Sequence, residues 1–412
     1  MKKIISLFLT LIILITVLPS CHDESTDKTR ITKAPASPSD KVEAESGDYG
    51  SIESFSEKLS LKLLENSTND NIVFSPLSAY LALAMVKEGA DGETLKEMTA
   101  VMGDLSAEDV YILISHLTTL ENTQLNIANS VWIDTASNIN PRREYLDNLS
   151  DYYLAECYKT LLCAAENEVN AWISEHTNGM IEKMLDETAL DECVMSLVNT
   201  IYINANWENK FDASNTRKRN FTNSDGSTSE IDFMHNSVRN ELVIESDAYI
   251  GVTLPYEDTS LRFVAVMPTN EASDTKAALE AVYADGGWKS IAENAEHEKI
   301  RLYLPSFEYN SSLSLRETLS ALGIKTAFTA GADFSGIDEG LMLDSVLQNA
   351  AIKLHENGTE ASAATVVTVK VTGALLPAEK VRTIEFNRPF VFAVVDTVSG
   401  AVLFAGEYNT AD

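Results

Sequence analysis

The sequence predicts a single α+β domain that spans residues 50–412. Two observations predict it. Stretches with apolar residues at helical spacing occur between runs of β-branched residues that favour strands, and no internal repeat or linker divides this part of the chain. The hydrophobic content of 45% is enough for a sizeable core.

The first half of the domain begins with a helix, since Ile52, Phe55 and Leu59 recur at helical spacing within Ser51–Glu65. Polar residues around Asp70 break this helix. The next expected elements are, in chain order, a strand at Ile72–Pro76, a buried helix at Leu77–Lys87, a strand at Leu125–Trp132 and a helix from Val169 that Gly179 closes.

The second half of the domain consists mainly of strands. Ser196–Trp207 is the longest of them. The other expected strands lie at Val252–Tyr256, Leu261–Pro268, Ile300–Pro305, Val391–Val395 and Ala401–Ala405. The last two are joined by a turn at Ser399-Gly400.

The N-terminus is a targeting segment. Lys2 and Lys3 precede an apolar run, Ile4–Leu18, that is too short to span a membrane comfortably. The run ends in Leu-Pro-Ser-Cys21, which resembles the lipobox of bacterial lipoproteins. This resemblance implies a signal peptide at residues 1–20, a lipidated Cys21, and an extracellular protein anchored to the bacterial membrane. Acyl chains on that cysteine would be the membrane anchor.

Residues 21–49 are polar and carry no apolar period, so we expect a disordered tether there. The chain is strongly acidic, with 62 Asp and Glu against 31 Lys and Arg and a net charge of −31. This balance argues against nucleic acid as a partner and against electrostatic docking on anionic lipid. Solubility is the preferred explanation of the charge.

Local signatures of catalysis are absent from the sequence. It contains no GxSxG elbow, no GxGxxG and no Walker loop, so we expect no enzyme and no cofactor. The six histidines lack metal-ligand spacing, which predicts no metal site. With Cys21 lipidated, three cysteines remain and we expect no disulfide framework, although a bridge between Cys157 and Cys163 is left open.

Residues 356–378 have an unusual composition. Asn357-Gly358 is a turn pair, small residues follow it, and a β-branched run follows them. At every second position the side chain is small or apolar, whereas Glu360 and Lys370 fall on the other face. The residues alone leave three interpretations open: an edge strand, a hairpin arm or a weak helix.

Three motifs resemble one family, the serpins. Residues 356–365, ENGTEASAAT, resemble the hinge of a serpin reactive-centre loop, and residues 386–392, FNRPFVF, resemble the strand that follows this loop. Residues 71–80, NIVFSPLSAY, resemble the segment under the centre of the main sheet. The resemblance covers nearly all of residues 50–412. It implies a large central five-stranded sheet, two further sheets, about nine helices and an exposed loop at about residues 356–380.

The resemblance also implies a mechanism. In inhibitory serpins a protease cleaves the loop, becomes acylated, and is carried to the far pole as the loop inserts into the central sheet. A charged residue at position 359 would mark a non-inhibitory serpin, and this chain has Thr359. The hinge residues carried over are Glu356, Gly358, Thr359, Ala361, Ala363 and Ala364.

Insertion of the loop is expected to be favourable in free energy, and the hinge residues permit it. About a dozen new backbone hydrogen bonds at roughly 1 kcal/mol each would stabilise the inserted state by on the order of 10 kcal/mol. The uninserted form is then trapped kinetically. The small inward-facing residues pass between strands without a charge to desolvate.

Residues that control opening of the sheet carry over from the family by position. Ser75, Ser78 and Asn199 fall at the mid-sheet shutter, and Trp207 falls at the breach, where insertion starts. Gln348 departs from the family, which commonly has His there, although Gln still forms hydrogen bonds with hydroxyls and amides. Satisfaction of buried polar groups is the alternative explanation for these residues.

The family's hinge-to-bond distance places the scissile bond between Thr372 and Gly373. Val369, Lys370 and Val371 precede it, and this composition suits a shallow primary pocket. We therefore expect elastase-like or subtilisin-like serine proteases as partners of a monomeric inhibitor. The alternatives are attack by trypsin-like proteases at Lys370 and a non-inhibitory serpin that acts as a carrier or chaperone.

Overall fold

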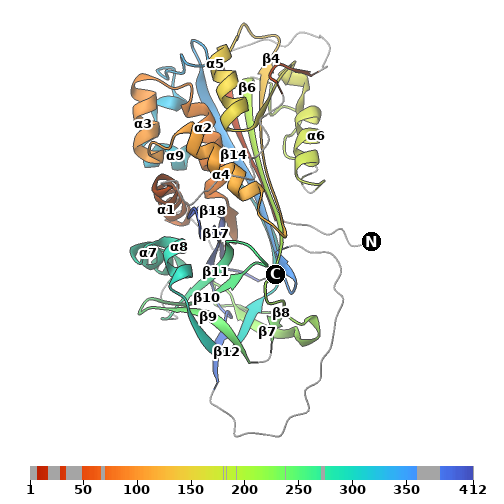
Figure 1. Ribbon diagram of the computed structural model, residues 1–412, viewed down its shortest axis with the longest axis vertical. Coiled ribbons are helices and arrows are strands. Elements are labelled where there is room, and N and C mark those ends of the chain that lie inside the picture. The colour runs from red at the N-terminus through yellow and green to blue at the C-terminus, as the bar shows by residue number, and fades with distance from the viewer. Residues whose placement is uncertain are drawn as a thin grey trace.

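The structure is a computed structural model, and it describes residues 7–16, 28–33, 49–65, 70–179, 181, 183–191, 193–236, 238–270, 274–359 and 381–411. Figure 1 shows an elongated molecule with a tall sheet in the upper part and a second sheet below it. Helices pack around these two sheets.

The tall sheet contains the five strands expected for its centre. In spatial order these are β13 (Phe307–Ser314), β14 (Met342–His355), β6 (Cys193–Asn206), β4 (Thr123–Asp134) and β5 (Ala155–Thr160). Three shorter or added strands complete an eight-stranded sheet over the described residues: β1 (Leu7–Thr16), β15 (Gly358–Thr359) and β2 (Thr29–Arg30).

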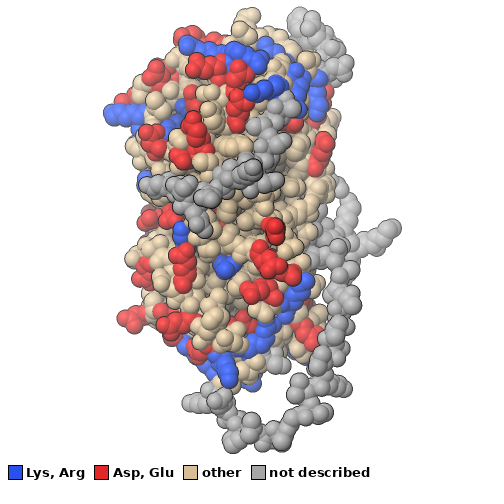
Figure 2. Space-filling model, viewed as in Figure 1, with Lys and Arg blue, Asp and Glu red and all other residues tan. Residues whose placement is uncertain are grey.

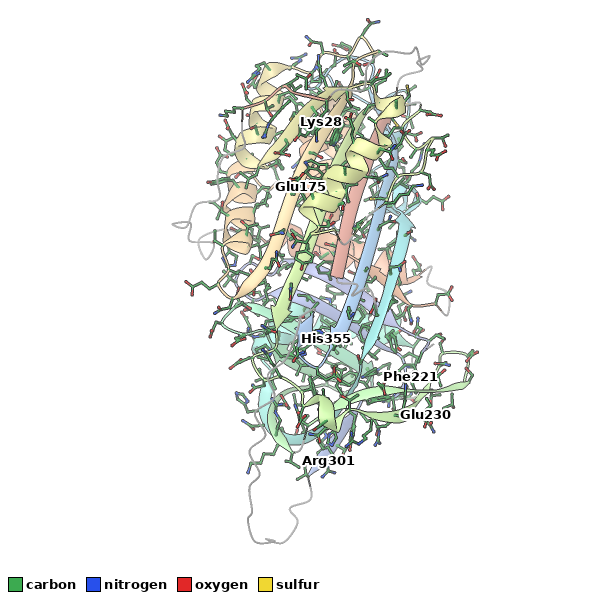
Figure 3. The ribbon with its side chains drawn as sticks, turned by 90° about the vertical axis from the view of Figure 1, so that its right-hand side faces the viewer. Lys28, Glu175, Phe221, Glu230, Arg301 and His355 are labelled. Carbon is green, nitrogen blue, oxygen red and sulfur yellow. The ribbon has the colours of Figure 1, made fainter. Side chains whose placement is uncertain are left out.

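The strand β1 lies between β14 and β6 and is antiparallel to both of them. Figure 3 shows this red strand between the yellow-green β6 and the blue β14. The sequence predicts a leader over these residues, and the structure gives them a place in the sheet. The physical reason is composition, because an apolar run rich in isoleucine favours a buried strand as well as an export signal. Ile13 is completely buried there.

The second sheet has ten strands over the described residues. Its order is β3 (Ile72–Phe74), β18 (Val402–Tyr408), β17 (Phe390–Asp396), β11 (Leu261–Pro268), β10 (Tyr249–Pro255), β9 (Arg239–Glu245), β12 (Glu296–Pro305), β8 (Thr228–His235) and β7 (Arg217–Thr222), with β16 (Arg382–Glu385) paired to β12. Two separate further sheets are expected from the sequence. They are joined because β9 pairs with β10 on one side and with β12 on the other.

The described residues form nine α-helices, as expected. They are α1 (Gly50–Glu65), α2 (Pro76–Lys87), α3 (Gly92–Met102), α4 (Ala107–Thr118), α5 (Arg143–Tyr152), α6 (Glu166–His176), α7 (Thr275–Ala284), α8 (Gly287–Glu293) and α9 (Arg316–Leu322). In Figure 1, α6 lies on one face of the tall sheet, and α2 to α5 lie on the other side.

The helix α2 is buried between the two sheets. Every residue from Pro76 to Val86 is buried, so this helix forms the centre of the core. It begins where it does because Ser75 has extended backbone angles and its side chain accepts a hydrogen bond from the amide of Ser78. Pro76 occupies the first helical position, where a missing N–H costs nothing.

Charged side chains cover both ends of the molecule. Figure 2 shows acidic and basic side chains interspersed over the visible face, from its upper to its lower end. Mixed charges of this kind keep a surface hydrated, which agrees with solubility as the explanation of the acidic composition.

Residues 28–33 lie against the edge strand β5, which differs from a free tether over this stretch. Thr29 and Arg30 pair with Lys159 and Tyr158, and Arg30 is 3.0 Å from the Glu156 carboxylate. The unpaired backbone groups of β5 explain the contact, because an edge strand accepts a further strand.

The structure decides one point about the cysteines that the sequence leaves open. Cys157 and Cys193 are free, which excludes the bridge between Cys157 and Cys163. Burial raises the pKa of the Cys157 thiol to about 12, so this thiol stays protonated and unreactive.

Candidate functional site: the hinge and the strand slot

The site is the space between β14 and β6, which we call the strand slot, together with the hinge that enters it. The slot is filled by β15 at the end near the second sheet, which we call its head, and by β1 over the rest of its length. Both fillers run antiparallel to the two walls, so β14 and β6 are parallel to each other. Backbone N–H and C=O groups of two parallel walls are therefore available to a strand that runs the opposite way.

The hinge leaves β14 through a tight reversal at Glu356 and Asn357. Gly358 has φ of +154°, and a Cβ atom there would lie 2.0 Å from the backbone oxygen of Ala205. Only glycine fits this position, because any side chain would collide with β6. The sequence places the turn pair one residue later, at Asn357-Gly358.

Thr359 is the first side chain of the hinge inside the sheet. Its backbone pairs with Ala205 of β6 and Leu354 of β14, and its side chain is completely buried. Its hydroxyl is 2.5 Å from the hydroxyl of Tyr256. Burial raises the pKa of Tyr256, so the pair stays neutral. A charged side chain at position 359 would be desolvated without a counter-ion.

The breach at the head of the slot is fixed by Trp207. Its indole Nε1 donates to the carbonyl oxygen of His355 at 2.9 Å, and its backbone amide donates to the carbonyl oxygen of Asn357 at 2.8 Å. The ring stacks on Tyr256 at a centroid distance of 4.7 Å and meets Phe263 edge-on. The expected breach residue therefore lies at the hinge and holds it by hydrogen bonds and stacking.

Glu356 and His355 brace the reversal itself. Phe211 donates its backbone amide to the carbonyl oxygen of Glu356, and Thr216 donates its hydroxyl to the Glu356 carboxylate. His355 Nδ1 donates to the carbonyl oxygen of Gly358 at 2.6 Å. Figure 3 places His355 at the lower end of β14, where the tall sheet meets the second sheet.

The shutter residues come together at the start of α2. Ser78 donates its hydroxyl to Asn199 Oδ1, Asn199 Nδ2 donates to Asn129 Oδ1 at 2.7 Å, and Asn129 Nδ2 donates to the carbonyl oxygen of Tyr153 at 2.7 Å. All three side chains in this chain of bonds are buried, and it ties β6 to both α2 and β4. Two of the residues expected at the shutter, Ser78 and Asn199, thus lie in one buried polar cluster, and their role in opening the sheet stays a prediction.

Gln348 holds the other wall of the slot to the same helix end. Its Oε1 accepts from the amide of Ser75 at 3.1 Å, and its Nε2 donates to the carbonyl oxygen of Ser75 at 3.0 Å. Gln348 is completely buried, so both bonds satisfy groups that have no access to water. The amide thus pairs with the main chain and not with a neighbouring hydroxyl.

Several predicted site residues lie outside the described residues. They are Ala361, Ala363, Ala364, Val369, Lys370, Val371, Thr372, Gly373 and Cys21. The scissile bond, the loop specificity residues and the lipidation site therefore stay predictions.

Two residues of the site, Asn129 and Tyr256, do not follow from the sequence. The sequence assigns Asn129 only to a strand and Tyr256 only to the end of one. The position of this asparagine in the middle of a strand is the available signal for Asn129, because a buried amide needs partners. For Tyr256 the sequence holds no such signal, since its contact with Thr359 joins residues far apart in the chain.

The described residues contain no group of three or more His, Cys, Asp and Glu side chains that could hold a metal ion. Among the same residues, no helix is both long and apolar enough to cross a bilayer. What the described site offers is backbone pairing for one extended segment, with polar side chains beneath it.

Comparison with known proteins agrees with this geometry. The family model for Serpin (serine protease inhibitor) matches residues 51–411. An uncharacterized serpin-like protein of Thermococcus kodakarensis is 33% identical over 370 residues, with 86% of this chain and 84% of that protein covered. Iripin-2 of Ixodes ricinus is 30% identical over 365 residues, with 85% and 90% covered.

A solved structure has the same fold. The thermophilic serpin tengpin in its native state is 31% identical, with a TM-score of 0.78, and the match covers 93% of this chain and 100% of tengpin. The expected architecture, with its central five-stranded sheet and nine described helices, is therefore confirmed.

Proposed function

Since the chain belongs to the serpin family, whose general activity is protease inhibition, we propose that it is a trapping inhibitor of serine proteases. In this proposal the protease cleaves the loop that follows the hinge. The acyl-enzyme is then carried along as the loop enters the strand slot. The protein is the bait and not the catalyst, so no enzyme activity is proposed.

The observation that carries the proposal is the hinge. Gly358 and Thr359 already pair with both walls at the head of the slot, and Thr359 is neutral, small and completely buried. Entry of further residues continues an existing strand, so the slow nucleation of a new strand is avoided. Ala361 and Ala363 are equally free of charge and bulk.

The proposed targets are elastase-like or subtilisin-like proteases. With Thr372 on the acyl side and Val369 and Val371 before it, the loop offers small and β-branched side chains to a shallow pocket. Cleavage at Lys370 by a trypsin-like protease is the second candidate. Since residue 370 lies nearer the hinge, it leaves a shorter arm and favours simple turnover of the chain as a substrate.

The test is formation of an SDS-stable covalent complex with a panel of elastases, subtilisins and trypsins. Thr359→Arg should abolish the complex while the loop is still cut, because the guanidinium cannot enter the buried site beside Tyr256. Thr359→Ser is the matched control and should keep the complex. Cleavage without any complex in the wild type would instead indicate a non-inhibitory serpin.

Mass spectrometry of the released C-terminal peptide identifies the bond. A fragment that begins at Gly373 supports the proposed site, and one that begins at Val371 contradicts it.

We also propose that Cys21 carries the lipid anchor, which would hold a monomeric inhibitor outside the cell at the bacterial membrane. Support comes from the lipobox-like residues 18–21 and the polar stretch that follows them. Metabolic labelling with a fatty-acid analogue should mark the wild type and leave Cys21→Ser unmarked. Equal labelling of both would contradict the anchor.

A further inference from the structure

The strand β1 occupies the place that an inserted loop would take. Thr359 lies opposite Ala205 of β6 and Leu354 of β14, and Leu7 lies two positions further along β6, opposite Ile203. Continuing β15 in register would therefore put Ala361 where Leu7 lies. The same offset puts Val367 where Ile13 lies, opposite Leu197 and Val346.

The two segments are mutually exclusive. They share direction, both walls and register, so Leu7–Ile15 take the places of residues 361–369. Ile13 is completely buried, and β1 also contacts α2 beneath it. A loop that begins to insert is stopped before residue 361, because β1 holds that place and those that follow.

We propose that β1 is an internal plug, which keeps a chain that still carries its N-terminal segment from inserting its own loop. This inference rests on the proposed trapping mechanism for its functional consequence. Removal of residues 1–20 takes away β1 whole and opens the slot. The step that would expose Cys21 for acylation would then also make the inhibitor competent, so that a precursor retained inside the cell stays inert.

The covalent connection makes such a plug effective. Residues 17–49 join β1 to α1, and a link of this kind gives an effective concentration on the order of millimolar. If the strand binds the slot with a dissociation constant of roughly 1 μM, molecules with a filled slot would outnumber those with an empty slot by about 1000 to one. Loop insertion in the intact chain should slow by a similar factor.

The experiment compares three forms of the full-length chain, made so that residues 1–20 are retained. These are the wild type, Ile13→Asp, and Ile13→Val as the matched control. Asp at a completely buried position should expel β1, whereas Val keeps the strand. The readouts are hydrogen exchange of β6 and β14, the melting temperature before and after the loop is nicked, and the rate of covalent complex formation.

For the plug we expect slow exchange in the wild type and in Ile13→Val, and no rise in melting temperature when their loops are nicked. Ile13→Asp should exchange faster, melt lower, gain stability on nicking, and form the complex at least tenfold faster. A synthetic peptide of residues 2–17 should return Ile13→Asp to wild-type behaviour.

The outcomes separate the two proposals. Equal exchange, melting and complex formation in wild type and Ile13→Asp would overturn the plug and leave the trapping mechanism standing. A difference in exchange and melting without any complex in either form would support the plug as a structural element and count against the trapping mechanism.

Discussion

The middle of β6 and the middle of β17 are both completely buried, yet different side chains line them. In β6 the buried residues include Ser196, Asn199 and Thr200, whereas β17 buries Phe390 and Phe392 along an unbroken apolar run. The tall sheet thus has a polar centre and the second sheet has an aromatic one.

The difference teaches which sheet can accept a new strand. Phe392 packs against Phe307 and Phe263 at centroid distances of 5.6 Å each, a close-packed arrangement that tolerates little displacement. In β6, the hydroxyls of Ser196 and Thr200 have no hydrogen-bond partner within the described part of the chain. Small polar groups exchange partners more readily than interlocked rings, so the sheet that would open in the proposed mechanism is the one with the polar centre.

The largest expected effect tests the head of the slot. Gly358→Ala should push the hinge out of the sheet, because its Cβ would lie 2.0 Å from the Ala205 oxygen and its backbone would be strained. We expect a loss of about 3 kcal/mol for the hinge-in state, which is roughly a 100-fold slower insertion. Stopped-flow kinetics of complex formation measures it.

The matched control for Gly358→Ala is Gly226→Ala, in the turn between β7 and β8. Gly226 has φ of +83°, but no atom lies within 4 Å of the place that a Cβ would take there, so only the backbone penalty remains. Insertion should be unchanged. Equal slowing by both substitutions would mean that the close approach to β6 is irrelevant.

The next effect tests the second sheet through Asp396, which is completely buried at the end of β17. Its carboxylate lies 3.1 Å from His116 Nε2 and accepts hydrogen bonds from the hydroxyls of Ser260 and Ser399. Asp396→Asn should destabilise the intact and the nicked protein alike by about 2 to 3 kcal/mol. Chemical unfolding of both forms checks this. An effect on only one form would contradict the view that the second sheet is the same before and after the loop is nicked.

The same carboxylate gives a pH dependence. Burial alone would raise the pKa of Asp396, but the hydrogen bonds and charge of His116 and the bonds from Ser260 and Ser399 outweigh it and lower the pKa. A pKa lower in the folded than in the unfolded state contributes stability above the unfolded value, about 3.9, which is lost as the pH falls through the folded value. The wild type should therefore lose more stability than Asp396→Asn on acidification below about pH 4.

A smaller effect is expected at Gln348. Gln348→Ala removes two hydrogen bonds to the main chain of Ser75 and leaves both groups buried, at a cost of about 2 kcal/mol. Gln348→His should cost less, since an imidazole replaces one of the two bonds. Insertion rates that respond to Gln348→Ala and not to Asp396→Asn would sharpen the contrast between the two sheets.

The smallest effect is expected at Trp207. Trp207→Phe removes the bond from Nε1 to the His355 oxygen but keeps an aromatic ring on Tyr256. The cost should be about 1 kcal/mol. Thermal unfolding measures it, and a loss several times larger would show that the indole does more than hold the hinge.

Much of the fold can be predicted from the sequence because its signals are local. The bounds of β11 agree with the predicted strand at Leu261–Pro268, and Ser75-Pro76 marks the start of α2. The hinge is recognisable because a turn pair, small residues and a β-branched run follow one another.

What the sequence does not predict depends on pairing between distant segments. The two expected sheets are joined because β9 pairs with a strand on each side. The residues Arg239–Glu245 do not by themselves predict this double pairing. The place of β1 is hidden for a related reason. A leader and a buried strand need the same apolar residues, so composition cannot distinguish them.

Both walls of the slot are hydrogen-bonded near their midpoints to the start of α2, since Ser75 bonds to Gln348 and Ser78 bonds to Asn199. The separation of β14 from β6 is therefore governed by the tilt of a single helix that is packed on every side. Partial widening would break bonds at one wall without a compensating gain at the other. The slot should consequently open in a two-state manner, and molecules with a partly widened slot should be rare at equilibrium.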